Sequence, residues 1–214
     1  MALRVGITGN IGSGKTLVCS IFEHLNVPVF YADKEAKLLY DNDIVKRNVK
    51  NYFGSTSYFE NGTLNRAFIS ECVFNDRKAL DFLENILYPA LNERFEYWSE
   101  QNQTKDYVLY EAALIFEKNL QSRFDKLILV TAPESLRLAR VMKRDALSKE
   151  QIRLRMKQQW NESEKQKKVD FVIENDNQNM LIPQVLKIHQ ALKGASKNSK
   201  DKACDRDKSG VYLV

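Results

Sequence analysis

The stretch Gly9-Asn10-Ile11-Gly12-Ser13-Gly14-Lys15-Thr16 decides the fold, because it fits the phosphate-binding pattern G-x-x-x-x-G-K-[ST]. Glycines let the backbone turn its N–H groups inward around phosphate oxygens, and a following helix adds the positive end of its dipole. In this pattern Lys15 reaches the β- and γ-phosphates of a nucleotide, and the Thr16 hydroxyl is a ligand of Mg²⁺. The sequence therefore predicts binding of ATP with Mg²⁺ at residues 9–16.

The phosphate-binding pattern requires a strand before it and a helix after it, and both are expected here. Residues 3–8 indicate a short buried strand, and residues 17–25 carry apolar side chains at helical spacing. Further strands are expected at 28–31, 107–110, 127–130 and 171–173, and helices at 33–40, 44–52, 134–144, from Ser148 (as N-cap) onward, and 180–192. After a turn at 54–62, a further helical stretch is expected, and it should break near Pro89. This alternation predicts an α/β fold, in which a five-stranded parallel sheet carries helices on both faces.

One domain is expected over residues 1–193, with additions that suit a small-molecule kinase. A helical insertion at about 41–100 would hold the acceptor, and an Arg-rich helical pair at about 137–168 would form a lid over the phosphates. Residues 194–214 are mostly Lys, Asp, Ser and Gly with few apolar side chains, so we expect a disordered tail there.

The positive charge of the chain is concentrated in the predicted lid. The net charge is +5 overall, whereas residues 137–168 contain eleven Lys or Arg and four acidic residues. Such a basic surface is aimed at phosphates, either of a nucleotide or of a nucleic acid.

Several classes of protein are excluded or disfavoured by what the sequence lacks. Cys19, Cys72 and Cys204 are far apart and form no C-x-x-C pair, which disfavours a disulfide framework or a zinc site. The guanine-reading N-K-x-D pattern is absent, which disfavours a GTPase. No apolar stretch approaches the roughly 18 residues that span a bilayer, and no signal peptide is evident, so we expect a cytoplasmic protein without a membrane partner. The sequence gives no indication of the oligomeric state.

Three further residues are candidates for the chemistry. Asp33 lies just beyond the second strand, at the edge where open α/β sheets bind ligands, and its carboxylate would take the proton of an attacking hydroxyl. Alternatively, Asp33 only caps a helix that begins at Lys34. Arg140 and Arg144 are four residues apart and share one helix face, which favours a joint role in the lid over a merely solvated face.

An ordered series of short matches resembles the dephospho-coenzyme A kinase family over about residues 3–190. The series comprises Ile7-Thr8-Gly9 with Ile11 to Lys15, Ala32-Asp33, Leu64, Arg66, Phe74, Leu83-Glu84, Ile86, Pro89, Leu114-Ile115-Phe116-Glu117, Arg140, Arg144, Arg155, Gln159 and Asp170 to Asn175. The resemblance implies transfer of the ATP γ-phosphate to the ribose 3′-hydroxyl of dephospho-coenzyme A (dephospho-CoA), the last step of coenzyme A (CoA) synthesis. It implies that Asp33 accepts or orients the hydroxyl proton and that Lys15, Arg140 and Arg144 stabilise the transferred phosphoryl group. It also places Asn175 beside the adenine of ATP.

Four residues depart from the pattern that this family usually shows. Asn10 replaces a usual glycine, Tyr31 a common aspartate, Tyr88 a usual histidine and Ala113 a usual proline. Tyr31 and Tyr88 bear on the acceptor side, where a tyrosine hydroxyl can still donate a hydrogen bond. Glu111, at the end of the third strand, is a further candidate for ordering the water molecules around Mg²⁺.

Two other functions remain open on the sequence alone. One is a kinase for another small acceptor, such as a nucleoside monophosphate. The other is a nucleic-acid-stimulated ATPase that uses the basic segment at 137–168 and the tail. This interpretation is disfavoured because the arginines have a helical spacing that suits a lid and only Trp160 supplies a stacking aromatic side chain there. We therefore expect small-molecule partners and no nucleic acid.

Overall fold

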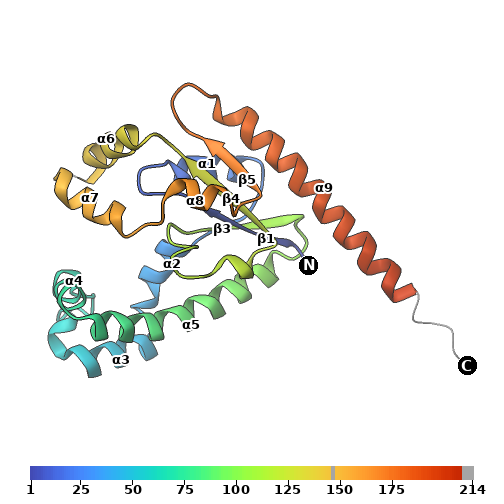
Figure 1. Cartoon of the computed structure of the whole chain (residues 1–214). Helices are drawn as coiled ribbons and strands as arrows, with labels where there is room; N and C mark the ends of the chain where they lie inside the picture. Colours follow the sequence, from blue (N-terminus) through green and yellow to red (C-terminus); the bar gives the residue numbers. More distant parts are fainter. Residues whose placement is uncertain (146–147, 209–214) are drawn as a thin grey trace, which may run out of the picture. The chain divides into compact units, whose positions relative to one another are not determined.

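A computed structural model describes residues 1–145 and 148–208 of the chain (Figure 1). Its five strands are β1 (Leu3–Thr8), β2 (Val29–Tyr31), β3 (Tyr107–Glu111), β4 (Lys126–Thr131) and β5 (Phe171–Glu174). They form one sheet in the order β2-β3-β1-β4-β5, and the pairs β1–β3, β1–β4 and β4–β5 are parallel. The predicted α/β fold and its five strands are confirmed.

The chain divides into two compact units, a sheet unit and a helical unit. The sheet unit comprises Met1–Phe30 and the described part of the segment from Ser99 onward, and the helical unit comprises Tyr31–Trp98. The helical unit begins earlier than the predicted insertion at about residue 41, so Asp33 belongs to it.

Burial explains why the sheet forms where it does. All five residues of β3 are buried, as are the last four of β1 and the middle four of β4, which is typical of parallel strands covered on both faces. Helix α1 (Lys15–His24) buries Val18, Cys19 and Phe22. Cys19 is therefore a buried free thiol, as its apolar neighbours suggested, and Cys72 is half-buried.

The sheet unit contains four further α-helices among its described residues: α6 (Glu134–Asp145), α7 (Lys149–Lys157), α8 (Glu162–Gln166) and α9 (Leu181–Lys208), with a short η2 (Gln121–Arg123). Ser148 caps α7 as predicted. The Gln151 N–H donates to Ser148 Oγ at 3.2 Å, and the Ser148 N–H donates to Gln151 Oε1 at 3.0 Å, so the two residues form a capping box. Among the helices that the structure describes, none is long and apolar enough to cross a membrane.

The helical unit consists of α2 (Ala32–Leu39), α3 (Asp43–Phe53), η1 (Ser55–Ser57), α4 (Arg66–Asn75) and most of α5 (Arg77–Gln101). Its core is a cluster of five buried side chains, which are Val45, Val49, Tyr58, Ile69 and Leu83. The Tyr58 hydroxyl donates to the Tyr40 carbonyl at 2.9 Å. This unit therefore has a small apolar core of its own.

Two helices differ from the sequence-based expectation. Helix α5 runs through Pro89 without a break, because buried side chains on both sides of the proline, including Leu83 and Leu91, hold one continuous helix against the cost of a missing N–H. Helix α9 continues to Lys208, within the segment 194–214 where the sequence predicted a disordered tail; the rest of that prediction, at 209–214, lies outside the described residues. A polar composition disfavours a core but does not prevent a helix, and no proline follows Pro183 to end it.

Candidate active site

The phosphate-binding loop lies between β1 and α1, as predicted. Two of its glycines are required by their surroundings. Gly12 has φ +80°, and a Cβ there would lie 2.5 Å from the Arg137 carbonyl oxygen. Gly14 has φ +91°, and a Cβ there would collide with the side-chain amide of Asn175. Any larger residue at these two positions would strain the loop or displace its neighbours.

A cavity of about 170 Å³ lies against the loop and is lined by Gly12, Gly14, Lys15, Thr16, Arg140, Val141 and Arg144. The structure therefore brings three of the predicted cationic residues to one cavity. They come from two helices, because Lys15 opens α1 whereas Arg140 and Arg144 share one face of α6. Three positive charges around one cavity make a site for a polyanion such as a triphosphate.

Each of these cations also has protein partners. Lys15 Nζ donates to the Gly9 carbonyl at 2.8 Å. Arg144 forms a two-point pair with Asp145, with nitrogen–oxygen distances of 2.6 and 2.9 Å. This hydrogen bonding raises the pKa of the Arg144 guanidinium and lowers the pKa of the Asp145 carboxyl. Arg144 thus stays charged beside the cavity.

Arg140 connects the loop to the segment after β5. Its Nη2 donates to the Asn175 carbonyl at 3.0 Å and to Asn177 Oδ1 at 2.7 Å, and its Nη1 lies 3.5 Å from the Gly12 carbonyl. A guanidinium can make several such bonds at once because its five N–H groups are fixed in a plane. Arg140 therefore orders the rim of the cavity besides contributing charge.

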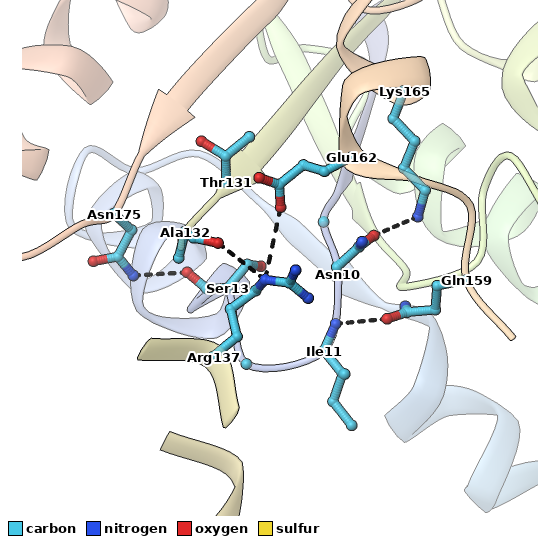
Figure 2. Close-up of polar contacts among 12 residues, drawn as sticks. Asn10, Ile11, Ser13, Thr131, Ala132, Arg137, Gln159, Glu162, Lys165 and Asn175 are labelled. Carbon is cyan, nitrogen blue, oxygen red and sulfur yellow. Dashed lines mark hydrogen bonds and ion pairs between the residues drawn. The ribbon is translucent and has the colours of Figure 1, made fainter. Parts of the chain in front are cut away.

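Asn175 lies directly after β5 and is 7% exposed. Its Nδ2 donates to the Ser13 carbonyl at 2.7 Å, and its backbone N–H donates to the Thr131 carbonyl at 2.9 Å. The sequence resemblance placed Asn175 beside adenine, and that contact stays a prediction. The structure adds a role that the sequence did not indicate, in which the Asn175 side chain holds the loop at Ser13 (Figure 2).

The other end of the loop contacts the segment around α8 (Figure 2). The Ile11 N–H donates to Gln159 Oε1 at 2.7 Å, and Asn10 Oδ1 accepts from Lys165 Nζ at 2.8 Å. Lys165 is fully buried and pairs with Glu117 Oε1 at 2.8 Å. Gln159 and Glu117 belong to the series of family matches, but nothing in the sequence indicated what they contact. Lys165 lies in a run of charged residues that is typical of a solvated face, so its burial was not foreseeable.

Arg137, which is buried, forms a further contact near the loop with the half-buried Glu162 (Figure 2). Arg137 Nε donates to the Ala132 carbonyl at 2.9 Å and lies 3.9 Å from Glu162 Oε2. Burial raises the pKa of Glu162, while the nearby Arg137 acts in the opposite direction. Arg137, on α6, thus connects the start of α8 to Ala132, directly after β4.

Asp33 is the second residue of α2 and is exposed. The helix begins at Ala32 with Tyr31 as its N-cap, so the alternative in which Asp33 caps a helix starting at Lys34 is wrong. The error arose because apolar spacing does not fix a helix start to within one or two residues. Neighbouring side chains are tied down, since Lys34 Nζ lies 4.0 Å from the centre of the Tyr31 ring and Glu35 pairs with Arg94.

The residues at the loop suit a magnesium ion that is held mainly by phosphates. Thr16 is exposed and lines the cavity with its neighbours, and Glu111 is 7% exposed at the end of β3. Within residues 1–145 and 148–208, no group of three or more His, Cys, Asp or Glu side chains is arranged to hold a metal by itself. Mg²⁺ at nucleotide sites is commonly bound through one or two protein groups together with substrate phosphates and water, which fits a single hydroxyl here.

Comparison with known proteins identifies a family. A sequence model described as dephospho-CoA kinase matches residues 3–180. A dephospho-CoA kinase of Bacteroides fragilis is 33% identical over 189 residues, covering 88% of this chain and 92% of that protein. One of Salinibacter ruber is 39% identical over 175 residues, covering 80% of this chain and 88% of that protein.

Solved structures agree with the sequence comparison. TT1252 from Thermus thermophilus has a TM-score of 0.80 at 32% identity, with 89% of this chain and 97% of that chain covered. Dephospho-CoA kinase from Campylobacter jejuni has a TM-score of 0.68 at 26% identity, with coverage of 91% and 99%. A shikimate kinase from Acinetobacter baumannii, at 17% identity and a TM-score of 0.50, shares the fold.

Proposed function

The chain belongs to the dephospho-CoA kinase family, and on that basis we propose a role for each site residue in the reaction of that family. The enzyme transfers the γ-phosphate of ATP to the ribose 3′-hydroxyl of dephospho-CoA, giving CoA and ADP. This reaction is the final step of CoA biosynthesis. The observation that supports our assignment of residues is the cavity where Lys15, Arg140 and Arg144 converge on the phosphate-binding loop.

The proposed ATP site is the cavity beside the loop. Backbone N–H groups of Gly12 and of residues 14–16, which line the cavity, would bind the β- and γ-phosphates, together with the positive N-terminal end of α1. Lys15 would bridge the same two phosphates. The Thr16 hydroxyl would hold Mg²⁺, which supplies positive charge to the phosphate oxygens when bound. We also propose that Asn175 lies beside the adenine of ATP.

Phosphoryl transfer makes few covalent demands on a protein, because its transition state is loose and charge gathers on the transferred oxygens. We propose that Lys15, Arg140 and Arg144 stabilise that charge and that Asp33 orients and accepts the proton of the 3′-hydroxyl. The exposed carboxylate of Asp33, in the first turn of α2, is accessible to a substrate. Positioning should matter more to the rate than the basicity of Asp33.

We propose that the helical unit, residues 31–98, binds dephospho-CoA. This unit carries Asp33 together with two of the departures on the acceptor side, Tyr31 and Tyr88. It also presents apolar side chains to solvent, such as Phe59 at 55% and Phe74 at 83% exposure, which suit the uncharged arm of the substrate. The proposed partners are therefore ATP, Mg²⁺ and dephospho-CoA, in the cytoplasm and without a nucleic acid or a membrane.

The assignment is tested by measuring ADP release with Mg²⁺ and ATP in parallel reactions. These contain dephospho-CoA, AMP, duplex DNA or no acceptor, and one further reaction contains dephospho-CoA with EDTA in excess of Mg²⁺. We expect release only with dephospho-CoA and free Mg²⁺, and mass spectrometry with ³¹P NMR should place the new phosphate on the ribose 3′ position. Release that depends on AMP or on DNA would refute the acceptor, and release unaffected by EDTA would refute the role of Mg²⁺.

A further inference from the structure

We propose that Lys165 is a positioning residue for ATP binding, acting through the side chain of Asn10. Its ammonium group donates to Asn10 Oδ1 at 2.8 Å inside the protein, where Lys165 has no exposed surface. The inference rests on the proposal that the loop holds the phosphates of ATP. In this proposal Lys165, which is far from the loop in sequence, keeps the loop in one conformation.

The loop has two parts with different bonding. In its outer part, which is Asn10 and Ile11, the polar groups bond to the protein. Asn10 Nδ2 donates to the Trp160 carbonyl at 3.3 Å, the Ile11 N–H donates to Gln159 Oε1 at 2.7 Å, and the Asn10 carbonyl accepts from the Ser13 N–H at 3.0 Å. In its inner part, Gly12 and Gly14 to Thr16 line the cavity. Fixing the outer part therefore sets the direction of the N–H groups in the inner part.

Glu117 holds Lys165 in place. The carboxylate Oε1 accepts from Lys165 Nζ at 2.8 Å and from the Trp160 N–H at 2.7 Å. The Trp160 ring stacks on Phe116 with ring centres 5.8 Å apart. Both segments that contact the outer part of the loop, Gln159–Trp160 and Lys165, are thus connected through one carboxylate.

A requirement for stability alone does not account for a buried ion pair at this position. Taking Lys165 and Glu117 out of water is costly, and two apolar side chains of similar size are often at least as stabilising. An apolar side chain at position 165 could not, however, donate to Asn10. The charge is therefore best explained by its bond to the loop, which requires a long side chain with several donors.

Asn10 supplies the side-chain acceptor that Lys165 requires in the loop. Its backbone does not have a positive φ, so no glycine is needed there for conformational reasons. A glycine at this position would offer Lys165 no side-chain acceptor and would make the backbone more flexible. In this chain the amide oxygen and Nδ2 of Asn10 bond in two directions, to Lys165 and to Trp160. The side chain thereby orders the outer part of the loop before ATP binds.

The test is a double-mutant cycle of Asn10→Ala and Lys165→Met, with Lys167→Met as the matched control because Lys167 is an exposed lysine of the same segment. Binding of a non-hydrolysable ATP analogue with Mg²⁺ is measured by calorimetry, together with kcat, KM for each substrate and thermal unfolding. We expect each single variant to weaken analogue binding about 10-fold, with the double variant no more than about twofold weaker than the worse single one. The KM for dephospho-CoA and the binding by Lys167→Met should change less than about twofold.

Three outcomes would overturn the inference. The first is binding by Asn10→Ala within about twofold of the wild type, the second is effects that multiply in the double variant, and the third is equal changes in the KM values of both substrates. Should Lys165→Met fail to fold, Asn10→Ala decides the matter, since it leaves the pair of Lys165 and Glu117 intact. A wild-type enzyme without ADP release in the presence of dephospho-CoA refutes the proposed function instead, so the two failures are distinguishable.

Discussion

The contact between Asn175 and the loop yields a quantitative prediction. Asn175→Ala removes the donor to the Ser13 carbonyl, in a place where Ser13 has no exposed surface and Asn175 is 7% exposed. A buried acceptor that loses its partner costs about 1–3 kcal/mol. At about 2–4 °C per kcal/mol for a chain of this length, we expect the melting temperature to fall by about 4–8 °C for a loss near 2 kcal/mol.

Gly14→Ala tests the same contact from the other side. A Cβ at φ +91° costs about 1–2 kcal/mol by itself. The added methyl group would also displace the Asn175 amide and break its bond to Ser13, for a further cost of about 1–3 kcal/mol. In the Asn175→Ala background this second cost is already present, so Gly14→Ala should then cost only about 1–2 kcal/mol.

Urea unfolding of the wild type, the two single variants and the double variant measures this coupling, with Asn175→Asp as the variant of equal size that lacks the donor. We expect Asn175→Asp to be at least as destabilised as Asn175→Ala, because a carboxylate would face the Ser13 carbonyl. Losses that simply add in the double variant would refute the reasoning, as would Asn175→Ala within about 0.5 kcal/mol of the wild type.

Four further predictions follow from the site and its surroundings. Asp33→Asn should lower kcat at least about 100-fold with little change in the binding of the ATP analogue; near-normal turnover would show that Asp33 is not the base. Lys15→Ala should raise KM for ATP and lower kcat as well, and unchanged steady-state kinetics would count against its place on the phosphates. Burial lowers the pKa of His189, whose ring nitrogen lies 2.6 Å from the Tyr107 hydroxyl. The unfolded chain therefore binds a proton at His189 more readily than the folded chain, and the free energy of unfolding should fall as the pH drops below about 6.5. His189→Gln should flatten this decline in urea unfolding between about pH 5 and 7, and an unchanged slope would contradict the assignment. Helix α7 (Lys149–Lys157) has one buried side chain, Ile152, whereas Gln159 and Lys165 bond to the loop, so in hydrogen exchange α7 should exchange faster than residues 159–165 and become protected when ATP binds. Equal exchange rates would argue against motion of α7 by itself.

The parts of the fold that the sequence predicted are those determined by local pattern. The five strands are short apolar runs, and the loop is a fixed spacing of glycines before Lys15, so both could be identified from neighbouring residues alone. The meeting of Arg140 and Arg144 at one cavity was also predictable, because residues four apart share a helix face. Tertiary packing decided the rest, as where α5 continues through Pro89.

The candidate site was less predictable because side-chain partners are distant in sequence. Asn175 could be placed after the last strand, but not whether its amide contacts adenine or the loop. A lysine between Glu164 and Gln166 is most often solvated, and only the fold shows that Lys165 is buried against Glu117. A run of charges therefore gives no indication that one member points inward.

The phosphate-binding loop is thus held at both ends by residues from later parts of the chain. Asn175 holds the Ser13 carbonyl beside the cavity, and Gln159 with Lys165 holds Ile11 and Asn10 on the outer side. Glycine-rich loops lose much conformational entropy when they are ordered, so contacts that order the loop in advance reduce what ATP binding must supply. The contacts at residues 159–165 also argue against motion of the whole predicted lid at 137–168, because a segment bonded to the loop cannot open without disturbing it. Movement that admits ATP is therefore expected in α7, where Ile152 is the one buried side chain of the helix.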